Sequence, residues 1–259
     1  MPILTKTCIA TNLILCAFQH AYAAECSAKS GAQTVPWLEL YTSEGCSSCP
    51  PADKWMSNIK AGNITPLAFH VDYWDYIGWK DKYSKAEYSN RQRKIAAFVG
   101  AGFVYTPQFV MNGRYFKGWD NSRLNQSIEA NQKLASRVNL SLDAVQENGK
   151  ITLQTSAQAV KLADTKNADV FVVLYENKLV SKVNAGENSG RELKHDYVVR
   201  EFFSAYPINN QNEFTKNFTL NPEWAKRGYK FENMGTVMFV QNSQTGEVLQ
   251  SKALKFCDS

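Results

Sequence analysis

The sequence predicts an α/β domain with the element order β-α-β-α-β-β-α, followed by an antiparallel β-sandwich. Two observations support this fold class. In residues 35–136, apolar runs typical of strands alternate with runs of helical periodicity. In residues 137–259, short strands with alternating polar and apolar side chains follow one another with few helices between them. Residues 24–34 form a short N-terminal segment ahead of the first domain.

The start of the chain, residues 1–23, has the parts of an export signal. Lys6 supplies a weakly positive start, and residues 9–18 are mostly apolar but too short to cross a bilayer. Residues 21–23, Ala-Tyr-Ala, then form a small-x-small cleavage site. A membrane anchor is the alternative, but the short length and two polar residues argue against it. We expect a periplasmic or secreted protein with no stable membrane anchor after cleavage.

Cleavage after residue 23 leaves four cysteines in the mature chain: Cys26, Cys46, Cys49 and Cys257. An even number of cysteines in an oxidising compartment indicates disulfides, and four allow three pairings. We favour Cys46–Cys49 with Cys26–Cys257, because the second pair flanks the mature chain; unpaired Cys26 and Cys257 are the alternative. Zinc held by all four is disfavoured, because only one close pair exists. A c-type haem needs a histidine where Pro50 stands. We expect no metal and no cofactor.

Cys46 and Cys49 stand between residues 35–42, a predicted strand, and residues 52–59, a predicted helix. Backbone N–H groups and the dipole at a helix N-terminus stabilise a thiolate, which makes Cys46 a nucleophile at ordinary pH. Cys49 follows three positions later and can close a disulfide with it. We expect Cys46 to be the more exposed of the two and to attack a substrate disulfide, while Cys49 resolves the mixed disulfide.

A second strand is predicted over residues 65–72, and an aromatic, acidic loop continues from it to Trp79. Ser84 and Glu87 have the spacing of a capping box that opens the next helix. Apolar residues then recur at helical intervals until the helix ends before Gly100.

Two antiparallel strands are predicted after Pro107, because Asn112-Gly113 between two apolar runs is a strong hairpin signal. Asp120 can cap a third helix. The buried side of that helix would be formed by Leu124, Ile128 and Leu134.

The second half of the chain has the texture of a β-sandwich, because apolar runs recur there with few helical patterns. The runs that predict strands are residues 138–142, 151–153, 169–175, 214–220, 236–240 and 248–254.

The first half resembles the thioredoxin fold in its element order, in Cys46 and Cys49 after the first strand, and in Thr106-Pro107 before the hairpin. The resemblance implies that Pro107 is a cis-proline packed against the cysteine pair. It also implies that the backbone at Thr106 offers hydrogen bonds to an extended substrate segment, beside Trp74 in the aromatic loop. The chain departs from thioredoxin in Gly45 before the pair and in the two serines within it, and both changes affect redox poise.

Four stretches carry a closer resemblance: residues 39–53 (ELYTSEGCSSCPPAD), 69–75 (FHVDYWD), 105–108 (YTPQ), and 186–191 (GENSGR) followed by His195-Asp196. They are similar to the signature of one family of secreted thioredoxin-like proteins, the domain of unknown function 1223 family. The resemblance covers nearly the whole mature chain.

We expect thiol–disulfide exchange through Cys46 and Cys49, with thiols or disulfides of proteins as the foremost substrates. The alternative is a non-catalytic exported binding or scaffold protein whose disulfides are structural. The reduction potential of the pair distinguishes the two, because structural disulfides have much lower values than catalytic ones.

Two carboxylates near the pair are candidates for a supporting role. Glu39, on the strand that leads to the motif, is a candidate proton acceptor for Cys49, and a partly exposed strand residue is the alternative. Glu44 is near enough to raise the pKa of the Cys46 thiol by charge repulsion, although we favour a solvated loop charge.

The loop from Asp72 to Trp79 follows the C-terminal end of a predicted parallel strand, where α/β sheets bind ligands. Its aromatic side chains, Tyr73, Trp74 and Trp79, would either form the wall of a substrate groove or pack between the two domains.

His70 and His195 are the histidines that remain after cleavage. We interpret a lone histidine as a hydrogen-bonded residue rather than a metal ligand. We expect His195-Asp196, with Arg191 and Arg200, to form the contact between the domains rather than a second site.

The formal net charge of +5 is spread along the chain. Because the lysines and arginines do not cluster, we expect no nucleic-acid partner.

Overall fold

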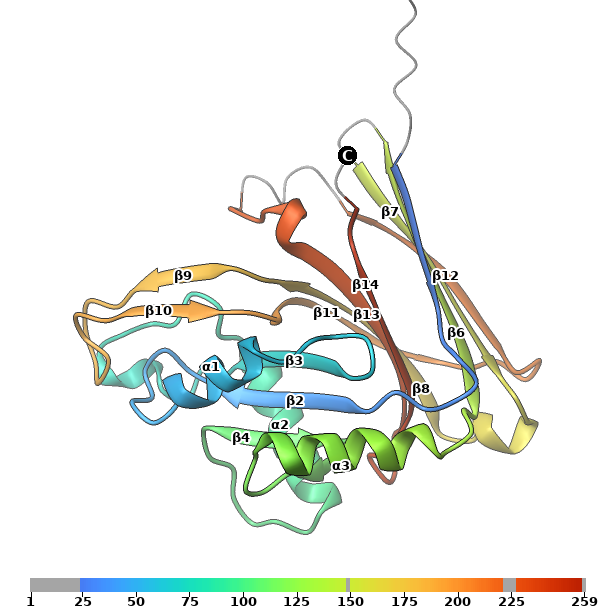
Figure 1. The fold of residues 1–259 in the computed structure, drawn as a ribbon, viewed down its shortest axis with the longest axis horizontal. Coiled ribbons are helices and arrows are strands. Elements are labelled where there is room, and N and C mark those ends of the chain that lie inside the picture. The colour runs from blue at the N-terminus through green and yellow to red at the C-terminus, as the bar shows by residue number, and fades with distance from the viewer. Residues whose placement is uncertain (1–23, 148–149, 221–226, 258–259) are drawn as a thin grey trace, which may run out of the picture.

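The computed structural model describes residues 24–147, 150–220 and 227–257 (Figure 1). The predicted export signal, residues 1–23, lies outside these ranges, as do residues 258 and 259. The described chain is a sheet-rich α/β fold with a mixed eight-stranded sheet, an antiparallel four-stranded sheet and a two-stranded sheet. Figure 1 shows the α-helices around β2, β3 and β4, with the four-stranded sheet on the other side of the molecule.

The eight-stranded sheet has the order β14-β13-β8-β11-β3-β2-β4-β5. Its strands are β2 (Trp37–Thr42), β3 (Thr65–His70), β4 (Gln108–Met111), β5 (Arg114–Tyr115), β8 (Ala168–Glu176), β11 (Val198–Pro207), β13 (Met234–Asn242) and β14 (Val248–Lys255). β3 pairs in parallel with both β2 and β11, and the other pairs are antiparallel. Because β11 comes from the second half of the chain, this sheet crosses the boundary predicted at residues 136 and 137.

Strand β2 is buried on both faces because helices cover it from both sides. Trp37 and Tyr41 pack with α2 (Ala86–Phe98). Leu38 and Leu40, which alternate with them, pack with α1 (Pro50–Ser57) and α3 (Asn121–Gln132). The two faces of β2 therefore lead to two different environments, and the cysteine loop lies on the α1 side.

The predicted hairpin and third helix are confirmed. β4 and β5 meet at Asn112 and Gly113, whose φ angles of 48° and 78° are those of a type I′ turn. Asp120 caps α3, because its side chain accepts a hydrogen bond from the Arg123 backbone N at 2.8 Å. Leu134, expected on the buried side of the helix, lies beyond its end and is 56% exposed.

The capping box predicted for α2 is wrong. Lys85 is the N-cap residue, and no side chain caps the helix there. The Ser84 hydroxyl donates instead within the preceding loop, to Asp75 Oδ2 (3.0 Å) or to the Asp81 carbonyl (2.9 Å). The hydroxyl that the spacing assigned to the helix is therefore used to hold the loop.

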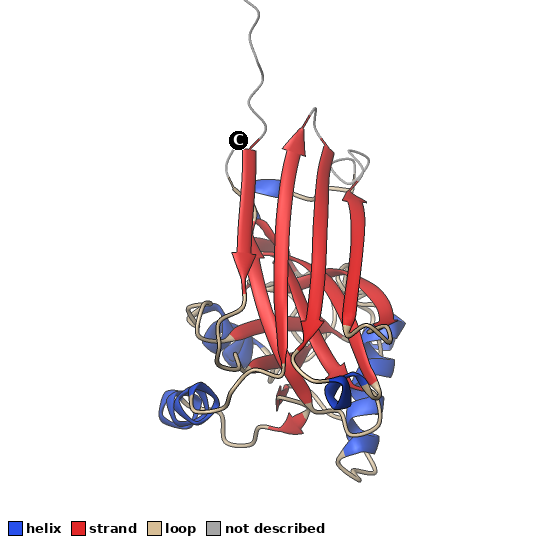
Figure 2. Cartoon of the chain, turned by 90° about the vertical axis from the view of Figure 1, so that its right-hand side faces the viewer, coloured by secondary structure: helices blue, strands red, loops and turns tan. Residues whose placement is uncertain are grey.

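The four-stranded sheet lies apart from the helices and faces the viewer in Figure 2. Its order is β1-β6-β7-β12, with β1 (Ala24–Lys29), β6 (Val138–Glu147), β7 (Lys150–Ala159) and β12 (Glu213–Leu220). Alternate side chains, such as Val138, Leu140 and Leu142, pack with apolar side chains of β8, β13 and β14 in one core. The two sheets therefore face each other across this core.

Four strands have no counterpart in the sequence prediction: β1, β9 (Leu179–Lys182), β10 (Glu192–His195) and β11. Residues 24–34, expected as a separate segment, supply β1, which pairs with β6. β9 and β10 pair with each other and form the two-stranded sheet. β10 contacts α1, so the second half of the chain reaches the helix that follows the cysteine pair.

A disulfide joins Cys26 in β1 to Cys257, just after β14, across a sequence separation of 231 residues. It ties both ends of the described chain together. In the described ranges, no helix combines the length and apolar character needed to span a membrane.

Candidate functional site

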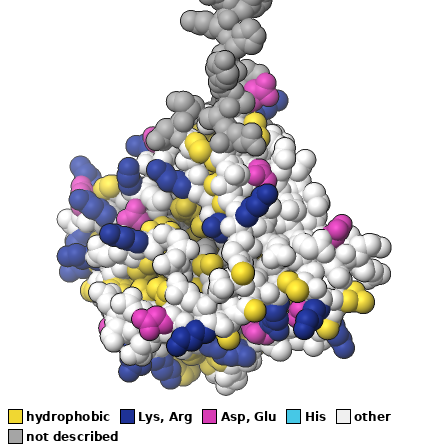
Figure 3. Space-filling model, turned by 45° about the vertical axis from the view of Figure 1, so that its right-hand side comes forward, with side chains coloured by type: hydrophobic (Ala, Val, Ile, Leu, Met, Phe, Trp, Pro, Cys, Tyr) yellow, Lys and Arg dark blue, Asp and Glu magenta, His cyan; other side chains and the backbone are white. Residues whose placement is uncertain are grey.

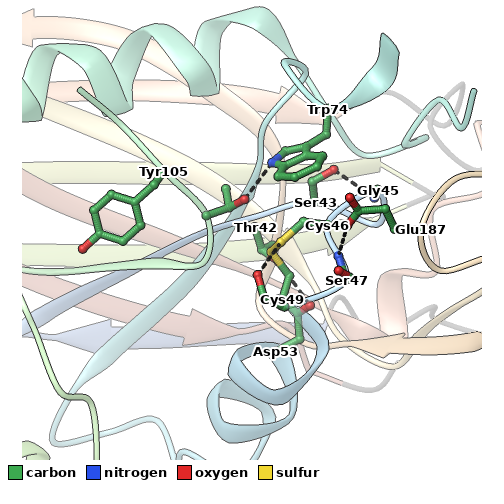
Figure 4. The surroundings of a disulfide bond; sticks show 12 residues. Thr42, Ser43, Gly45, Cys46, Ser47, Cys49, Asp53, Trp74, Tyr105 and Glu187 are labelled. Atoms are coloured by element: carbon green, nitrogen blue, oxygen red, sulfur yellow. Dashed lines mark hydrogen bonds between the residues drawn. A yellow bond between two sulfur atoms is a disulfide. The ribbon is translucent and has the colours of Figure 1, made fainter. Parts of the chain in front are cut away.

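Cys46 and Cys49 form a disulfide between β2 and α1, with their Cα atoms 5.4 Å apart (Figure 4). The two disulfides of the structure are the pairing favoured from the sequence. The loop turns because Cys46 N donates to the Ser43 carbonyl (3.1 Å) and Cys49 N donates to the Cys46 carbonyl (3.2 Å). Cys49 is the N-cap residue of α1, which places the pair directly at the start of the helix.

The N-terminus of α1 offers fewer donors than the sequence argument assumed. Pro50 and Pro51 occupy the first two helical positions, and proline has no backbone N–H. The N–H groups of the next two residues, Ala52 and Asp53, both donate to the Cys49 carbonyl, at 2.9 and 3.0 Å. None of the first four helical positions therefore has a backbone N–H group free to bind a sulfur. The helix dipole still acts on the sulfurs, but without a hydrogen bond from the helix N-terminus.

Both cysteines are fully buried, with 0% of their surface exposed. The prediction that Cys46 is the more exposed of the two is therefore wrong. Ser47 and Ser48 are exposed and form the surface above the pair. Ser48 Oγ lies 3.3 Å from Cys46 Sγ and is a side-chain donor for a thiolate there. A substrate thiol reaches the disulfide only when the residues that cover it move.

One covering loop follows β3. Figure 4 shows the Trp74 indole over the disulfide and the Tyr105 ring pointing away from it. The Trp74 Nε1 donates to Thr106 Oγ1 at 2.7 Å, and the Thr106–Pro107 peptide bond is cis, as the thioredoxin resemblance implied. The loop approaches closely because residue 45 is glycine: a Cβ there would lie 3.2 Å from Trp74 Cβ.

The second covering loop, residues 183–191, comes from the other half of the chain. Asn188 is buried, and its Nδ2 donates to the Glu44 carbonyl (2.8 Å) and to the Cys46 carbonyl (2.9 Å). Arg191 Nη1 donates to Asn188 Oδ1 at 2.9 Å and so fixes the orientation of the amide. The buried Asn188 side chain therefore fixes the backbone on both sides of Gly45, at Glu44 and at Cys46.

Glu187 closes the outer side of the same contact. Its Oε2 accepts a hydrogen bond from Ser47 N at 3.0 Å, and hydrogen bonds from Ser47 lower the pKa of the Glu187 carboxyl. Neither Asn188 nor Glu187 was predicted to have a role of its own. The sequence signal that could have indicated them is a polar stretch between two glycines, Gly186 and Gly190. In the structure these glycines have φ angles of 70° and 82°, as in a tight turn.

Beneath these loops lies a buried group of ionisable side chains, which we call the acid–histidine cluster: Glu44, Asp53, His70, Asp81 and His195. No member is more than 5% exposed. His70 Nδ1 lies 2.6 Å from Asp81 Oδ2. His195 stands between two carboxylates, with its Nε2 3.5 Å from Glu44 Oε1 and its Nδ1 3.8 Å from Asp53 Oδ2. The two histidine rings meet edge to face, with centroids 4.9 Å apart.

Burial and charge pairing set the pKa values in the cluster. Burial is the largest single influence and acts to raise the pKa of Asp81 and to lower that of His70. The attraction and hydrogen bond between the two, together with their other neighbours, outweigh it, so the pKa of Asp81 is lowered and that of His70 is raised. Burial raises the pKa of Asp53 against the opposing charges of His195 and His70. Burial also acts to raise the pKa of Glu44, yet the close contact with His195 contributes to holding it below its usual value. Asp53 therefore retains a proton more readily than Glu44 does.

Glu39 is not part of this cluster. It lies on the α2 side of β2, away from the cysteine pair, and is fully buried. Arg91 Nη2 donates to its Oε1 at 2.7 Å, Arg91 Nε donates to its Oε2 at 3.0 Å, and Trp37 and Tyr41 donate as well. Both interpretations of Glu39, as a proton acceptor for Cys49 and as a partly exposed strand residue, are wrong. Its carboxylate belongs to a buried ion pair.

The aromatic loop packs between the two halves of the chain. Trp79 Nε1 donates to Glu44 Oε2 at 2.8 Å, so the interpretation of Glu44 as a solvated loop charge is wrong. A Cβ at residue 186 would lie 3.1 Å from Ile77 Cδ1 and 3.3 Å from Trp79 Cβ, which explains the glycine in the second covering loop. Tyr73, the third aromatic candidate, donates its hydroxyl to Gln92 Oε1 at 3.1 Å.

The predicted contact between the halves is confirmed for His195, which meets Glu44 and Asp53. Arg200 also contributes, because its guanidinium lies 5.1 Å from the centroid of the Tyr83 ring and its carbonyl accepts from Lys85 Nζ at 2.6 Å. Asp196 instead accepts from Lys178 N at 2.9 Å, within the second half. Within the described residues, no group of three or more His, Cys, Asp or Glu side chains is arranged to hold a metal ion.

The profile of the family described as Protein of unknown function (DUF1223) matches residues 37–241. The chain belongs to this family. The match starts with β2 and ends in β13, so it includes the cysteine pair, both covering loops and the acid–histidine cluster of this DUF1223 protein. No curated protein matches the chain significantly.

Two solved structures are similar to this DUF1223 protein. The X-ray crystal structure of protein AGR_C_4864 from Agrobacterium tumefaciens is 22% identical with a TM-score of 0.62, and the match covers 89% of this chain and 98% of that one. HBP35 of Porphyromonas gingivalis is 12% identical with a TM-score of 0.62, over 87% of this chain and 76% of that one. At these identities the comparison establishes a shared fold alone.

Proposed function

We propose that this protein is an exported thiol–disulfide oxidoreductase that acts through Cys46 and Cys49. The observation that carries the proposal is a disulfide between cysteines three positions apart, at the start of a helix and against a buried cluster of ionisable groups. A bridge that closes so short a loop removes little entropy from the unfolded chain. Its place beside groups that can exchange protons favours a chemical role over a structural one.

The element order of the first half supports a thioredoxin-like domain over residues 35–136. We propose that residues 137–259 are a β-sandwich domain whose strand β11 continues the sheet of the first domain by pairing with β3. The elements β2, α1, β3, α2, β4, β5 and α3 follow in the order of that fold, and the cis bond before Pro107 precedes β4. Thr106, Pro107 and Trp74 then form the substrate-binding surface. An extended substrate segment would add to the backbone at Thr106, as a strand adds to a sheet edge.

The exchange starts from the oxidised pair. A substrate thiolate attacks Cys46 Sγ, the Cys46–Cys49 bond breaks, and its electron pair leaves on Cys49 Sγ, which takes up a proton. A second thiolate of the substrate then attacks the substrate sulfur of the mixed disulfide, and Cys46 leaves as a thiolate. The substrate leaves with a new disulfide, and the protein is left with two thiols. The same steps in reverse reduce a substrate disulfide.

The buried sulfurs require the covering loops to open during the reaction. Ser47 and Ser48 are the exposed residues above the pair. The hydrogen bonds from Asn188 to the Glu44 and Cys46 carbonyls hold the loop of residues 183–191 against it. Release of this one side chain frees the backbone around Cys46. The second half of the chain therefore shares control of substrate access with the Trp74 loop of the first half.

Two disulfides favour an oxidising compartment. Together with the export signal predicted at residues 1–23, they support a periplasmic or secreted protein without a stable membrane anchor. On the face in Figure 3, Lys and Arg side chains are interspersed with acidic and apolar ones, which is unlike a nucleic-acid footprint. The partners proposed are thiols or disulfides, foremost those of proteins.

The proposal is tested by turnover with a reduced, unfolded model protein in a glutathione buffer. The wild-type protein is expected to accelerate disulfide formation or rearrangement, and Cys46→Ser and Cys49→Ser are each expected to abolish the acceleration. The matched control is the double variant Cys26→Ser/Cys257→Ser, assayed at a temperature where it is folded, which keeps the activity. Equal rates with and without wild-type protein, in both directions of exchange, contradict the proposal.

A second candidate function is a non-catalytic exported binding or scaffold protein with a structural disulfide. The observation in its favour is the complete burial of both Cys46 and Cys49. This candidate predicts that Cys46→Ser/Cys49→Ser costs stability but leaves the cellular role intact. Complementation of a deletion strain by this double variant supports the scaffold, and failure of a folded double variant to complement excludes it.

A further inference from the structure

The proposed exchange requires a proton for Cys49, and the surroundings of Asp53 indicate where it comes from. Asp53 lies one helical turn after Cys49 on α1, so the two side chains share one face of the helix. Figure 4 shows the Asp53 carboxyl next to Cys49, with Thr42 beside it. Thr42 Oγ1 donates to Asp53 Oδ2 at 3.1 Å, which fixes the carboxyl at the end of β2.

His195 lies beside Asp53 at the wall of a cavity. Both residues line a cavity of about 380 Å³ between α1 and β10, with Lys54, Glu192, Lys194 and Asp196 among the other lining residues. The His195 side chain is buried, and neither ring nitrogen has a hydrogen-bond partner. Its Nδ1 is 3.8 Å from Asp53 and its Nε2 is 3.5 Å from Glu44. A small rotation of the ring is enough to form a hydrogen bond to Asp53.

The usual alternative donor is closed off in this chain. Glu39 is held by Arg91 on the other face of β2, so it has no path to the cysteine pair. The backbone N–H groups at the start of α1 are also engaged or missing. Among the described residues around Cys49, the carboxyl of Asp53 is the acid on its own helix face.

We propose that His195 carries a proton from this cavity to Asp53, and that Asp53 delivers it to the Cys49 sulfur when the Cys46–Cys49 disulfide is reduced. This inference rests on the proposed function. The S–S bond breaks as the substrate thiolate bonds to Cys46, the electron pair goes to Cys49, and the Asp53 proton neutralises it. Asp53 regains a proton from His195, and His195 regains one from water in the cavity. Because His195 acts through Asp53, it is a positioning residue.

The charged groups around His195 fit this role. The ionisable groups that face it are Glu44 from the cysteine loop, Asp53 from α1, His70 from β3, and Asp81 and Tyr83 from the loop before α2. Attraction to Asp81 and to neighbouring carboxylates contributes to raising the pKa of His70. Burial raises the pKa of Asp53, which favours the protonated form of the carboxyl on the helix face of Cys49. The second half of the chain thereby supplies a residue that the proposed chemistry needs.

The test is the rate at which dithiothreitol reduces the native Cys46–Cys49 disulfide between about pH 6 and pH 9. The thiolate fraction of the reductant rises tenfold per pH unit below its thiol pKa. In the wild-type protein the rate should rise less steeply, because the protonated relay is depleted as the pH increases. His195→Gln should be about tenfold slower or more at pH 6, as expected for loss of an acid catalyst, and the difference should close toward pH 9.

Asp53→Asn provides a second variant in case His195→Gln does not fold. It should give the same profile, and the double variant should be no slower than either single one, because the two residues act in series. Lys194→Gln is the matched control, since this residue lies next to His195 on β10, is exposed and lines the same cavity. It should keep the wild-type profile.

A ratio of wild-type to His195→Gln rates that is constant across the pH range, or close to one throughout, overturns the inference and leaves the proposed function standing. A wild-type disulfide that is not reduced at all in the folded protein overturns both.

Discussion

The two disulfides of this protein are the same bond in opposite settings. Cys26–Cys257 closes a loop across 231 residues and joins the first described strand to the end of the last. Cys46–Cys49 spans a sequence separation of 3, so it connects residues that the backbone already keeps close together. In the chain-entropy account, the long loop contributes about 5 kcal/mol to stability and the short one about 2 kcal/mol. The long bridge therefore has a sufficient structural reason to exist.

Solvent exposure does not indicate which of the two bridges takes part in the proposed exchange. Cys257 is exposed although its bridge is the structural one, while Cys46 and Cys49 have no exposed surface. The surroundings separate them instead. Cys26 packs in the apolar core between the two large sheets, whereas Cys46 and Cys49 lie among carboxylates, histidines and two covering loops. The two bridges therefore differ in what surrounds them, and the proposed exchange is assigned to the one beside ionisable groups.

The largest expected effect separates the two bridges by stability. Cys26→Ser/Cys257→Ser should lower the free energy of unfolding by about 5 kcal/mol, and Cys46→Ser/Cys49→Ser should lower it by about 2 kcal/mol, because the loop lengths differ. Urea unfolding of both double variants under non-reducing conditions measures this. Equal losses, or a larger loss for the short bridge, would show that Cys46–Cys49 is the structural staple.

The next largest effect is expected from the loop of residues 183–191, which covers Cys46–Cys49. Asn188→Ala removes the side-chain donor of the Glu44 carbonyl and one of the two donors of the Cys46 carbonyl, and one unsatisfied buried group costs about 1–3 kcal/mol. We expect a loss of stability of that size together with faster reduction of Cys46–Cys49 by dithiothreitol in the folded protein.

Glu187→Gln serves as the control for this variant, because the exposed Glu187 side chain holds only the outer edge of the loop. It should change neither quantity substantially. If Asn188→Ala is reduced no faster than the wild-type protein, the loop of residues 183–191 does not control access.

The pH dependence of stability tests whether the cluster beside the short bridge is charged. Because the pKa of His70 is raised in the folded state, its contribution is full below about pH 6.5 and is lost as the pH rises through the folded pKa. Because the pKa of Asp81 is lowered, its contribution is full above about pH 4 and is lost as the pH falls. Stability should therefore decline above pH 6.5, with a slope of at most about 1.4 kcal/mol per pH unit for one proton.

His70→Gln removes this proton and should flatten the decline between about pH 6.5 and pH 9, as measured by urea unfolding at several pH values. An unchanged slope in the variant would mean that the His70–Asp81 pair is not the titrating element.

The smallest expected effect concerns the nucleophile. Ser48 Oγ lies 3.3 Å from Cys46 Sγ, so Ser48→Ala removes a donor from the Cys46 thiolate of the reduced protein. The pKa of that thiol should rise, and alkylation at pH 7 should slow about threefold, which is within the energy of one hydrogen bond. Ser47→Ala is the matched control and should leave the rate unchanged. A rate for Ser48→Ala equal to that of the control would show that Ser48 does not support the thiolate.

Elements whose signals are local could be predicted from the sequence. The alternation in β2, the Asn112-Gly113 turn and the Asp120 cap each depend on residues within a few positions of one another. The capping box at Ser84 failed because the same hydroxyl has competing acceptors close by in sequence, Asp81 and Asp75, and spacing alone does not state which acceptor it uses. Strand β11 escaped prediction because its place in the fold depends on β3, far earlier in the chain. Strands β9 and β10 pair with each other, and each is only four residues long, too short for a clear alternation.

The cysteine pair could be predicted, but its surroundings could not. The residue that covers Cys46, Asn188, lies 142 positions later, and no local pattern reports that His195 meets Asp53. Glu39 was misplaced because the alternation of a strand states which residues share a face but not which helix covers that face.

The reduction potential of the Cys46–Cys49 pair tests the central claim most directly. It is measured in the folded protein against a series of redox buffers, with Cys26–Cys257 kept oxidised and both pairings verified by mass spectrometry. The account predicts a value among catalytic disulfides, between about −270 and −120 mV. A value below about −300 mV, where structural disulfides lie, would contradict it.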